Sequence, residues 1–95
     1  MRRGLPAAPL LAAIERHPQI GRPRPGWTER LRRYAGDAGW AAYQRGRAHG
    51  RLTLRAIEDL CDVFGWHPRQ VYGDAYDAAA LAGRPVGFDP WRGIA

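Results

Sequence analysis

Residues 53–65, TLRAIEDLCDVFG, carry the clearest helix signal in the sequence. Apolar side chains recur across residues 54–64 at steps of three, three, one and three, so they form one continuous stripe along a helix. Thr53 suits the N-cap of this helix, and Gly65 suits the C′ position that follows its last turn. We therefore expect a core helix in which Cys61 is a buried structural thiol rather than a metal ligand.

The N-terminal part of the chain predicts a helix followed by a loop. Pro9 can occupy the first turn of a helix that ends near His17, because Pro18 stops it there. The apolar stripe of this helix consists of Leu10, Leu11 and Ile14. Residues 19–26, QIGRPRPG, contain two prolines and two glycines and therefore predict a loop.

Two short helices joined by a turn are expected between this loop and residue 50. Thr28 is the expected N-cap of the first, with Glu29 in its first turn. The buried face of this helix is expected to consist of Leu31, Tyr34 and Ala35. Residues 36–39, GDAG, predict the turn, and the second helix is expected over residues 40–47, ending in a turn at 48–50.

A further turn and a last helix are expected after residue 65. The turn covers residues 68–73, with His67 as an N-cap or packing residue, and the helix runs from Asp74 to about residue 82. Residues 83–95 contain two prolines and three glycines, which predicts an irregular tail. Because strand-like alternation is absent, we expect an all-α fold: a single small domain of four to five helices over residues 1–82, followed by the tail.

Composition excludes several classes of protein. No run of eighteen apolar residues exists among the 95, so no membrane span or membrane partner is expected, and the cytoplasm is the expected location. The chain has no serine, no lysine and two threonines, both assigned as caps, so neither a nucleophile–base pair nor a phosphate-binding loop is expected. The three histidines and the single cysteine match no zinc spacing. We therefore expect no enzyme, no cofactor and no metal.

Charge is divided unevenly along the chain. Residues 1–55 carry twelve arginines against three acidic residues, a balance of +9. Residues 56–95 carry three arginines against six acidic residues, a balance of −3. A cationic half joined to a mildly acidic half is typical of a surface that faces a polyanion and a back that packs or meets protein.

Residues 28–47 have the features that a helix-turn-helix requires. Its second helix must be slim enough to enter the DNA major groove, which is about 12 Å wide. Small residues are expected where the helices approach closely, namely Ala35, Ala38, Ala41, Ala42 and Gly46. Gln44, Arg45 and Arg47 are side chains of the types that read base edges or bind phosphates. These features predict binding to duplex DNA.

The stretch from Tyr43 to Tyr76, YQRGRAHGRLTLRAIEDLCDVFGWHPRQVYGDAY, resembles helix-turn-helix regulators of the phage-repressor/Cro type found in actinobacteria and their phages. In that family a recognition helix is followed by a short basic turn and a Leu-Thr-Leu capped helix. A Leu-Gly-x-His-Pro-x-x-Val-Trp/Tyr-Gly segment comes next, and here residues 64–73 read FGWHPRQVYG. The resemblance implies a sequence-specific DNA-binding regulator of transcription, with a repressor as the typical member.

Departures from the family pattern leave two registers for the recognition helix. The departures are Arg32, the 36–39 turn, Gly46 and the long 19–26 loop. In one register Tyr43 and Arg47 face DNA, whereas in the other Tyr43 is buried in the core. We favour the second, because so small a helix needs one large apolar anchor. In that register Trp40, Ala41, Gln44 and Arg45 face DNA. The full set of expected DNA-binding residues adds four arginines to them: Arg32, Arg33, Arg47 and Arg51.

Two other functions use the same sequence features. The C-terminal half holds aromatic residues of the types enriched at interface centres: Trp66, Tyr72, Tyr76, Phe88 and Trp91. They predict a homodimer or protein partner through residues 66–95, or, as an alternative function, a small phage-type protein that binds a host protein there. The second alternative is a DNA-bending excision or architectural factor.

Overall fold

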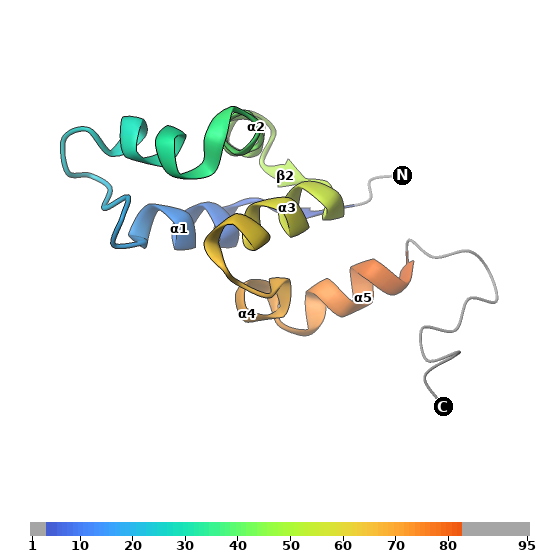
Figure 1. Ribbon diagram of the computed structural model, residues 1–95. Helices are drawn as coiled ribbons and strands as arrows, with labels where there is room; N and C mark the ends of the chain where they lie inside the picture. The colour runs from blue at the N-terminus through green and yellow to red at the C-terminus, as the bar shows by residue number, and fades with distance from the viewer. Residues whose placement is uncertain (1–3, 83–95) are drawn as a thin grey trace.

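The computed structural model describes residues 4–82, and these residues are mostly helical. The elements in chain order are β1 (Leu5–Pro6), α1 (Ala8–Arg16), α2 (Trp27–His49), β2 (Arg51–Leu52), α3 (Leu54–Phe64), α4 (Pro68–Tyr72) and α5 (Asp74–Ala82). Helices α1 and α3 lie between α2 on one side and α4 with α5 on the other (Figure 1). The expected all-α class is confirmed, with a very small sheet added to it.

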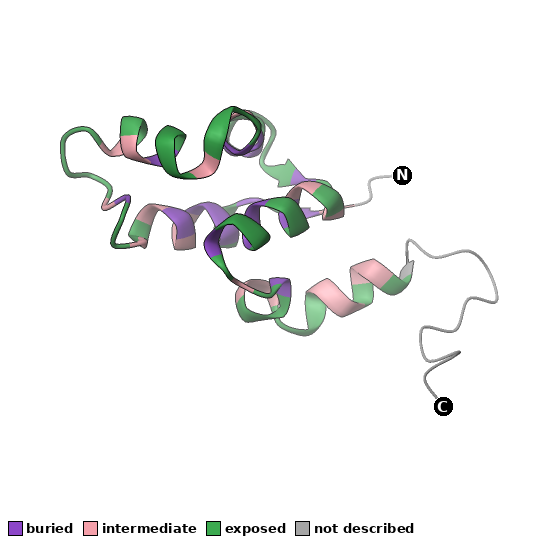
Figure 2. Cartoon of the chain, viewed as in Figure 1, coloured by how far each residue is buried: buried purple, intermediate pink, exposed green. Residues whose placement is uncertain are grey.

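Helix α3 is the central core element, as its apolar stripe predicts. Ile57, Leu60, Cys61 and Phe64 are buried, and the buried parts of α1 and α3 meet in the middle of the molecule (Figure 2). The Thr53 hydroxyl accepts a hydrogen bond from the Ala56 N–H at 3.1 Å, and Gly65 ends the helix with φ 75°, so both expected caps are confirmed. Burial raises the pKa of the Cys61 thiol to about 11, which keeps it protonated near neutral pH.

Helix α1 agrees with its prediction, but the following loop contributes more to the core than expected. Leu10, Leu11 and Ile14 are buried, and a proline occupies the first turn. Ile20 lies inside the 19–26 loop and is also fully buried. The Arg30 guanidinium holds this loop in place by donating to the carbonyl oxygens of Ile20 and Pro25, both at 2.9 Å. Arg30 therefore has a structural role, which is to hold the 19–26 loop against α2.

A two-stranded antiparallel sheet joins the start of the chain to the turn after α2. Leu5 pairs with Leu52, and Pro6 pairs with Arg51. The Ala7 N–H donates to a carbonyl oxygen of this turn at 2.9 Å and extends the connection toward α1. Strands of two residues are too short to give an alternating pattern, which is why the sequence does not predict them.

Helix α2 corrects two expectations about the helix-turn-helix segment. It begins at Trp27 after Gly26, which adopts a left-handed conformation, and Thr28 makes no capping hydrogen bond. The expected turn at 36–39 is reduced to Gly36, the one residue inside the helix with non-helical angles. The chain bends there, so the first half of α2 (residues 27–35) and the second half (residues 37–49) point in different directions (Figure 1).

The ends and faces of α2 also differ from the prediction. The second half begins earlier than expected, before residue 40, and continues to His49, so that only Gly50, with φ 76°, turns the chain. Tyr34 is 42 % exposed instead of buried. Its ring lies at the edge of the core and stacks on the Phe64 ring, with the two centroids 4.9 Å apart. Leu31 is fully buried as expected.

Replacing Gly36 is expected to destabilise the fold through the backbone alone. Gly36 has φ 75° and ψ 176°, a region open almost only to glycine, and no heavy atom lies within 4 Å of the place where a Cβ would stand. Both Gly36→Ala and Gly36→Asn should therefore lower the free energy of unfolding by about 1–3 kcal/mol in urea denaturation. Gly65→Asn should cost less than about 1 kcal/mol, because asparagine tolerates the left-handed helical angles there. Equal losses for the two asparagine variants would contradict this explanation of the bend.

The last two helices pack their aromatic residues within the same chain. His67 caps α4 by accepting from the Arg69 N–H at 3.1 Å, and Gln70 completes the capping box. The Tyr72 hydroxyl donates to the Pro6 carbonyl oxygen at 2.8 Å, and the Trp66 ring stacks on Phe64 at 5.0 Å. The expected tail at 83–95, with Phe88 and Trp91, lies outside the described residues. None of the helices within residues 4–82 is long and apolar enough to cross a membrane.

Candidate functional site

The uneven charge of the sequence separates two sides of the fold. Residues 4–53, which include α1 and α2, carry nine arginines against three acidic residues. Residues 54–82, which form α3, α4 and α5, carry two arginines against five acidic residues. Because α2 and α4 lie on opposite sides of α1 and α3, the positive charge gathers on the α2 side.

The second half of α2 exposes one polar face and buries the other. Its buried face consists of Gly39, Ala42, Tyr43 and Gly46. Gln44, Arg45 and Arg47 are exposed, and Trp40 and Ala41 are half-buried at the edges of the same outward face. Tyr43 is 1 % exposed, so its expected burial in the core is confirmed.

Small residues let the second half of α2 lie directly against its neighbours. A Cβ on Gly46 would stand 3.3 Å from Leu52 of β2 and 3.2 Å from the Ala7 methyl group. A Cβ on Gly39 would stand 2.6 Å from the Ala35 methyl group across the bend, and at the ordinary contact distance of 3.7 Å from Leu60 of α3. The expected close approach at Gly46 is therefore confirmed, whereas Ala38, expected at a helix contact, is exposed.

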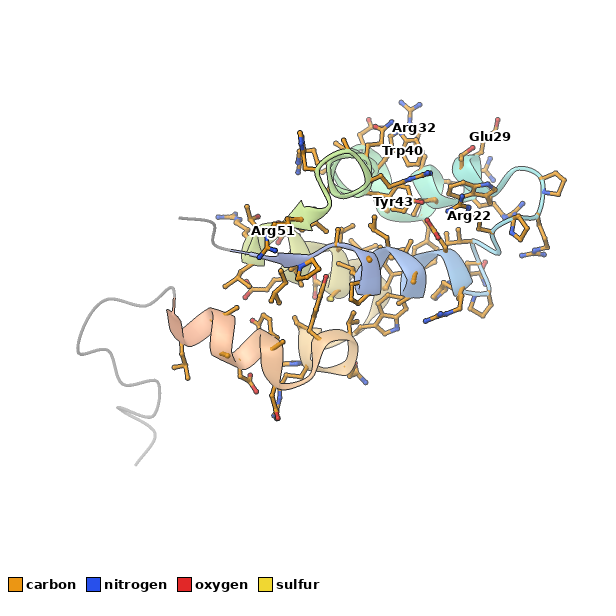
Figure 3. The ribbon with its side chains drawn as sticks, turned by 180° about the vertical axis from the view of Figure 1, so that it is seen from behind. Arg22, Glu29, Arg32, Trp40, Tyr43 and Arg51 are labelled. Carbon is orange, nitrogen blue, oxygen red and sulfur yellow. The ribbon has the colours of Figure 1, made fainter. Side chains whose placement is uncertain are left out.

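A closed network of side chains connects this helix half to α1 and to the 19–26 loop. The Tyr43 hydroxyl donates to Glu15 Oε2, and the same carboxylate oxygen accepts an ion pair from Arg22 Nη1 at 2.9 Å. The Arg22 guanidinium lies 5.0 Å from the centre of the Trp27 ring. The Trp27 and Tyr43 rings pack edge to face, with their centroids 6.2 Å apart. Trp40 stacks on the Tyr43 ring at 5.8 Å. Figure 3 shows Tyr43 pointing from α2 toward α1.

Burial is the main reason why the pKa of Tyr43 lies above the ordinary tyrosine value. It raises the pKa of the Tyr43 hydroxyl to about 12, and the hydrogen bond to Glu15 acts in the same direction. The positive charge of Arg47 opposes this shift. The hydroxyl is therefore protonated, and can donate to Glu15, throughout the physiological pH range.

A groove lies between the start of α2 and its second half. Its volume is about 370 Å³, and Tyr43 forms part of its wall. The other lining residues are Trp27, Thr28, Trp40, Gln44, Arg47 and Ala48. None of the residues that line the groove in the described part of the chain is acidic. Sequence reasoning identified Trp40, Gln44 and Arg47 but missed Trp27 and Thr28, because the bend that brings them together leaves no spacing signal.

The remaining predicted site residues lie outside the second half of α2. Arg32 points away from α1 and pairs with Asp37 across the bend at 3.4 Å (Figure 3). Arg33 is exposed beside Arg30 and Tyr34 on the first half. The Arg51 guanidinium donates to the Gly4 carbonyl oxygen at 2.8 Å and so helps to fasten the small sheet. The site thus has a compact part on one helix half and a dispersed part of three arginines.

Neither metal binding nor similarity to known proteins adds to this description. Within residues 4–82 no group of three histidine, cysteine or acidic side chains is placed to hold a metal ion. The chain matches no family model, no curated protein and no solved structure at a significant level. The geometry of α2 and the charge around it are therefore the basis for a functional proposal.

Proposed function

We propose that the protein binds duplex DNA sequence-specifically, with the second half of α2 in the major groove. The observation that carries this proposal is the outward face of that half: Gln44 and Arg45 are exposed beside the small residue Ala41. Glutamine and arginine make bidentate contacts with adenine and guanine edges. A helix with small side chains beside these polar groups can approach the bases closely.

The surrounding charge supports the same docking. Helix α2 carries five arginines against two acidic residues, whereas α3, α4 and α5 together carry two arginines against five acidic residues. Arg33 of the first half is suited to a backbone phosphate, since it is exposed and makes no ion pair among the described residues. In this proposal α2 acts as a helix-turn-helix whose turn is the bend at Gly36, and the protein is a non-catalytic transcriptional regulator of the phage-repressor/Cro type.

Substitutions in the second half of α2 are expected to separate base reading from general attraction. A DNA site is first selected from random duplexes, and its affinity is compared with that of an unrelated duplex at one salt concentration. Gln44→Ala or Arg45→Ala should lower affinity for the selected site by roughly 5- to 150-fold, since a good base contact is worth about 1–3 kcal/mol. Arg33→Ala should weaken both duplexes alike.

Arg16→Ala is the matched control. Arg16 is exposed on α1 and lines a different groove, next to Trp66 and α4, so its removal should change affinity for neither duplex beyond the general effect of one charge. If the Gln44 and Arg45 variants keep full preference for the selected site, the second half of α2 does not read bases. If the wild-type protein binds no duplex at 50 mM salt, the DNA proposal is wrong.

A further inference from the structure

We propose that the groove between the two halves of α2 holds the sugar–phosphate backbone of one DNA strand, with Trp27 and Trp40 against deoxyribose. This inference rests on the proposed function and adds to it a contact that is apolar and therefore independent of salt. The groove adjoins the outward face of the second half, because Gln44 and Arg47 belong to both. A strand that borders the major groove would pass beside that face.

The chemistry of the groove fits a backbone segment. Its walls are two half-buried indole rings, which suit the apolar face of a sugar. Arg47 lies at the groove, and its guanidinium, which also acts on the Tyr43 hydroxyl, can balance a phosphate. The Thr28 hydroxyl is exposed in the first turn of α2 and can donate to a second phosphate oxygen. The positive N-terminal end of the first half of α2 also favours an anion there.

Energetics favour the backbone over a base as the occupant. Extracting a paired base from the duplex costs a few kcal/mol, and stacking it on an aromatic ring returns only about 1–3 kcal/mol. The backbone of an intact duplex needs no such rearrangement. Two tryptophan rings beside a duplex-binding helix therefore stabilise binding more when they contact sugars than when they capture a base.

The groove is held in shape before any ligand arrives. The Arg22 guanidinium covers one side of the Trp27 ring at 5.0 Å, and Glu15 fixes Arg22 by an ion pair at 2.9 Å. The buried Tyr43 ring stacks on the Trp40 ring, with their centroids 5.8 Å apart, and so supports it from the core. Because these rings are already ordered, little side-chain entropy is lost on binding. Arg22 and Glu15 are thus positioning residues, and we do not expect them to touch DNA.

The test compares Trp27→Ala, Trp27→Phe and the wild-type protein on a blunt duplex at several salt concentrations. Trp27→Ala should weaken binding by about 5- to 30-fold, which corresponds to losing roughly 40–80 Å² of buried apolar contact. The loss should be the same at every salt concentration and for every sequence, because no counterions are involved. Trp27→Phe should recover most of the affinity. Trp66→Phe, far from the groove, should bind like the wild type.

A second pair of variants keeps the test valid if Trp27→Ala does not fold. Ala48 lines the groove and is exposed, so substitutions there spare the core. Ala48→Glu should weaken binding at least 10-fold at low salt, because its charge would face the phosphates. Ala48→Gln, of nearly the same size, should weaken it much less. Circular dichroism before each titration verifies that the variants are folded.

The outcomes separate this inference from the proposed function. Wild-type binding that neither Trp27→Ala nor Ala48→Glu weakens would overturn the groove contact and leave DNA binding intact. A duplex with a one-nucleotide overhang that binds more tightly than the blunt duplex, with only that gain lost in Trp27→Ala, would overturn it in favour of a base site. A wild-type protein that binds no duplex would overturn both.

Discussion

Leu60→Ala is expected to lower the free energy of unfolding by about 2–5 kcal/mol, the range for removing a fully buried leucine side chain. Leu60 is 1 % exposed and lies on the face of α3 that meets the second half of α2 at Gly39. A glycine cannot extend a side chain into the space left behind, so the cavity should remain open. Urea unfolding followed by circular dichroism measures the loss, which is a large part of the stability of a small domain.

Val63→Ala on the same helix is the control for this experiment. Val63 is 40 % exposed, so the same kind of truncation should cost less than about 1 kcal/mol. A Leu60→Ala protein that unfolds at the same urea concentration as the wild type would contradict the central place of α3. A large loss for both variants would instead indicate that the cost of truncation does not follow burial along α3, since alanine is the better helix former at both positions.

The sequence predicts best those elements in which apolar residues recur at helical spacing over several turns. Helix α3 has a stripe of apolar residues between Thr53 and Gly65, and both the stripe and its caps are found where they are expected. Tyr43 is predicted as the buried anchor for a similar reason, since it is the one large residue on a face of glycine and alanine. In these cases local pattern and tertiary packing favour the same structure.

The bend in α2 could not be predicted at its true length. Two glycines at positions 36 and 39 look alike in the sequence and together predict a four-residue turn. In the structure only Gly36 leaves helical geometry, whereas Gly39 is helical and buried against Leu60. Tertiary packing therefore determines which glycine bends the chain, and a single sequence does not contain that information.

The groove and its supporting network could not be predicted either. Glu15, Arg22 and Tyr43 share one carboxylate oxygen but are separated by up to 28 residues, and Trp27 joins them only because α2 bends. A contact between residues so far apart in the sequence follows no fixed sequence spacing, so no motif predicts it. The sequence also does not show which arginines are free to bind a ligand. Arg30 and Arg51 donate to carbonyl oxygens of their own chain, and a count of positive charges does not distinguish them from the other arginines.

Affinity for duplex DNA is expected to fall steeply as salt rises. About four to six phosphate contacts give a slope of log affinity against log salt of roughly −3 to −6, which amounts to roughly a 60- to 4,000-fold loss between about 50 and 200 mM. Fluorescence anisotropy with a labelled duplex at five or more salt concentrations measures this slope. A slope near zero would contradict a phosphate-binding surface.

Individual arginines should contribute to that slope according to their surroundings in the fold. Arg33 and Arg45 are exposed and belong to none of the ion pairs found within residues 4–82, so each alanine substitution that removes a phosphate contact should reduce the slope by about one. Arg47 is also exposed, but its guanidinium acts on the Tyr43 hydroxyl, so its loss should change the slope by at most about one. Arg32 is already paired with Asp37 at 3.4 Å, and its loss should change the slope less. Since all four lie on the same helix, this ranking tests the geometry of α2 and not the net charge alone.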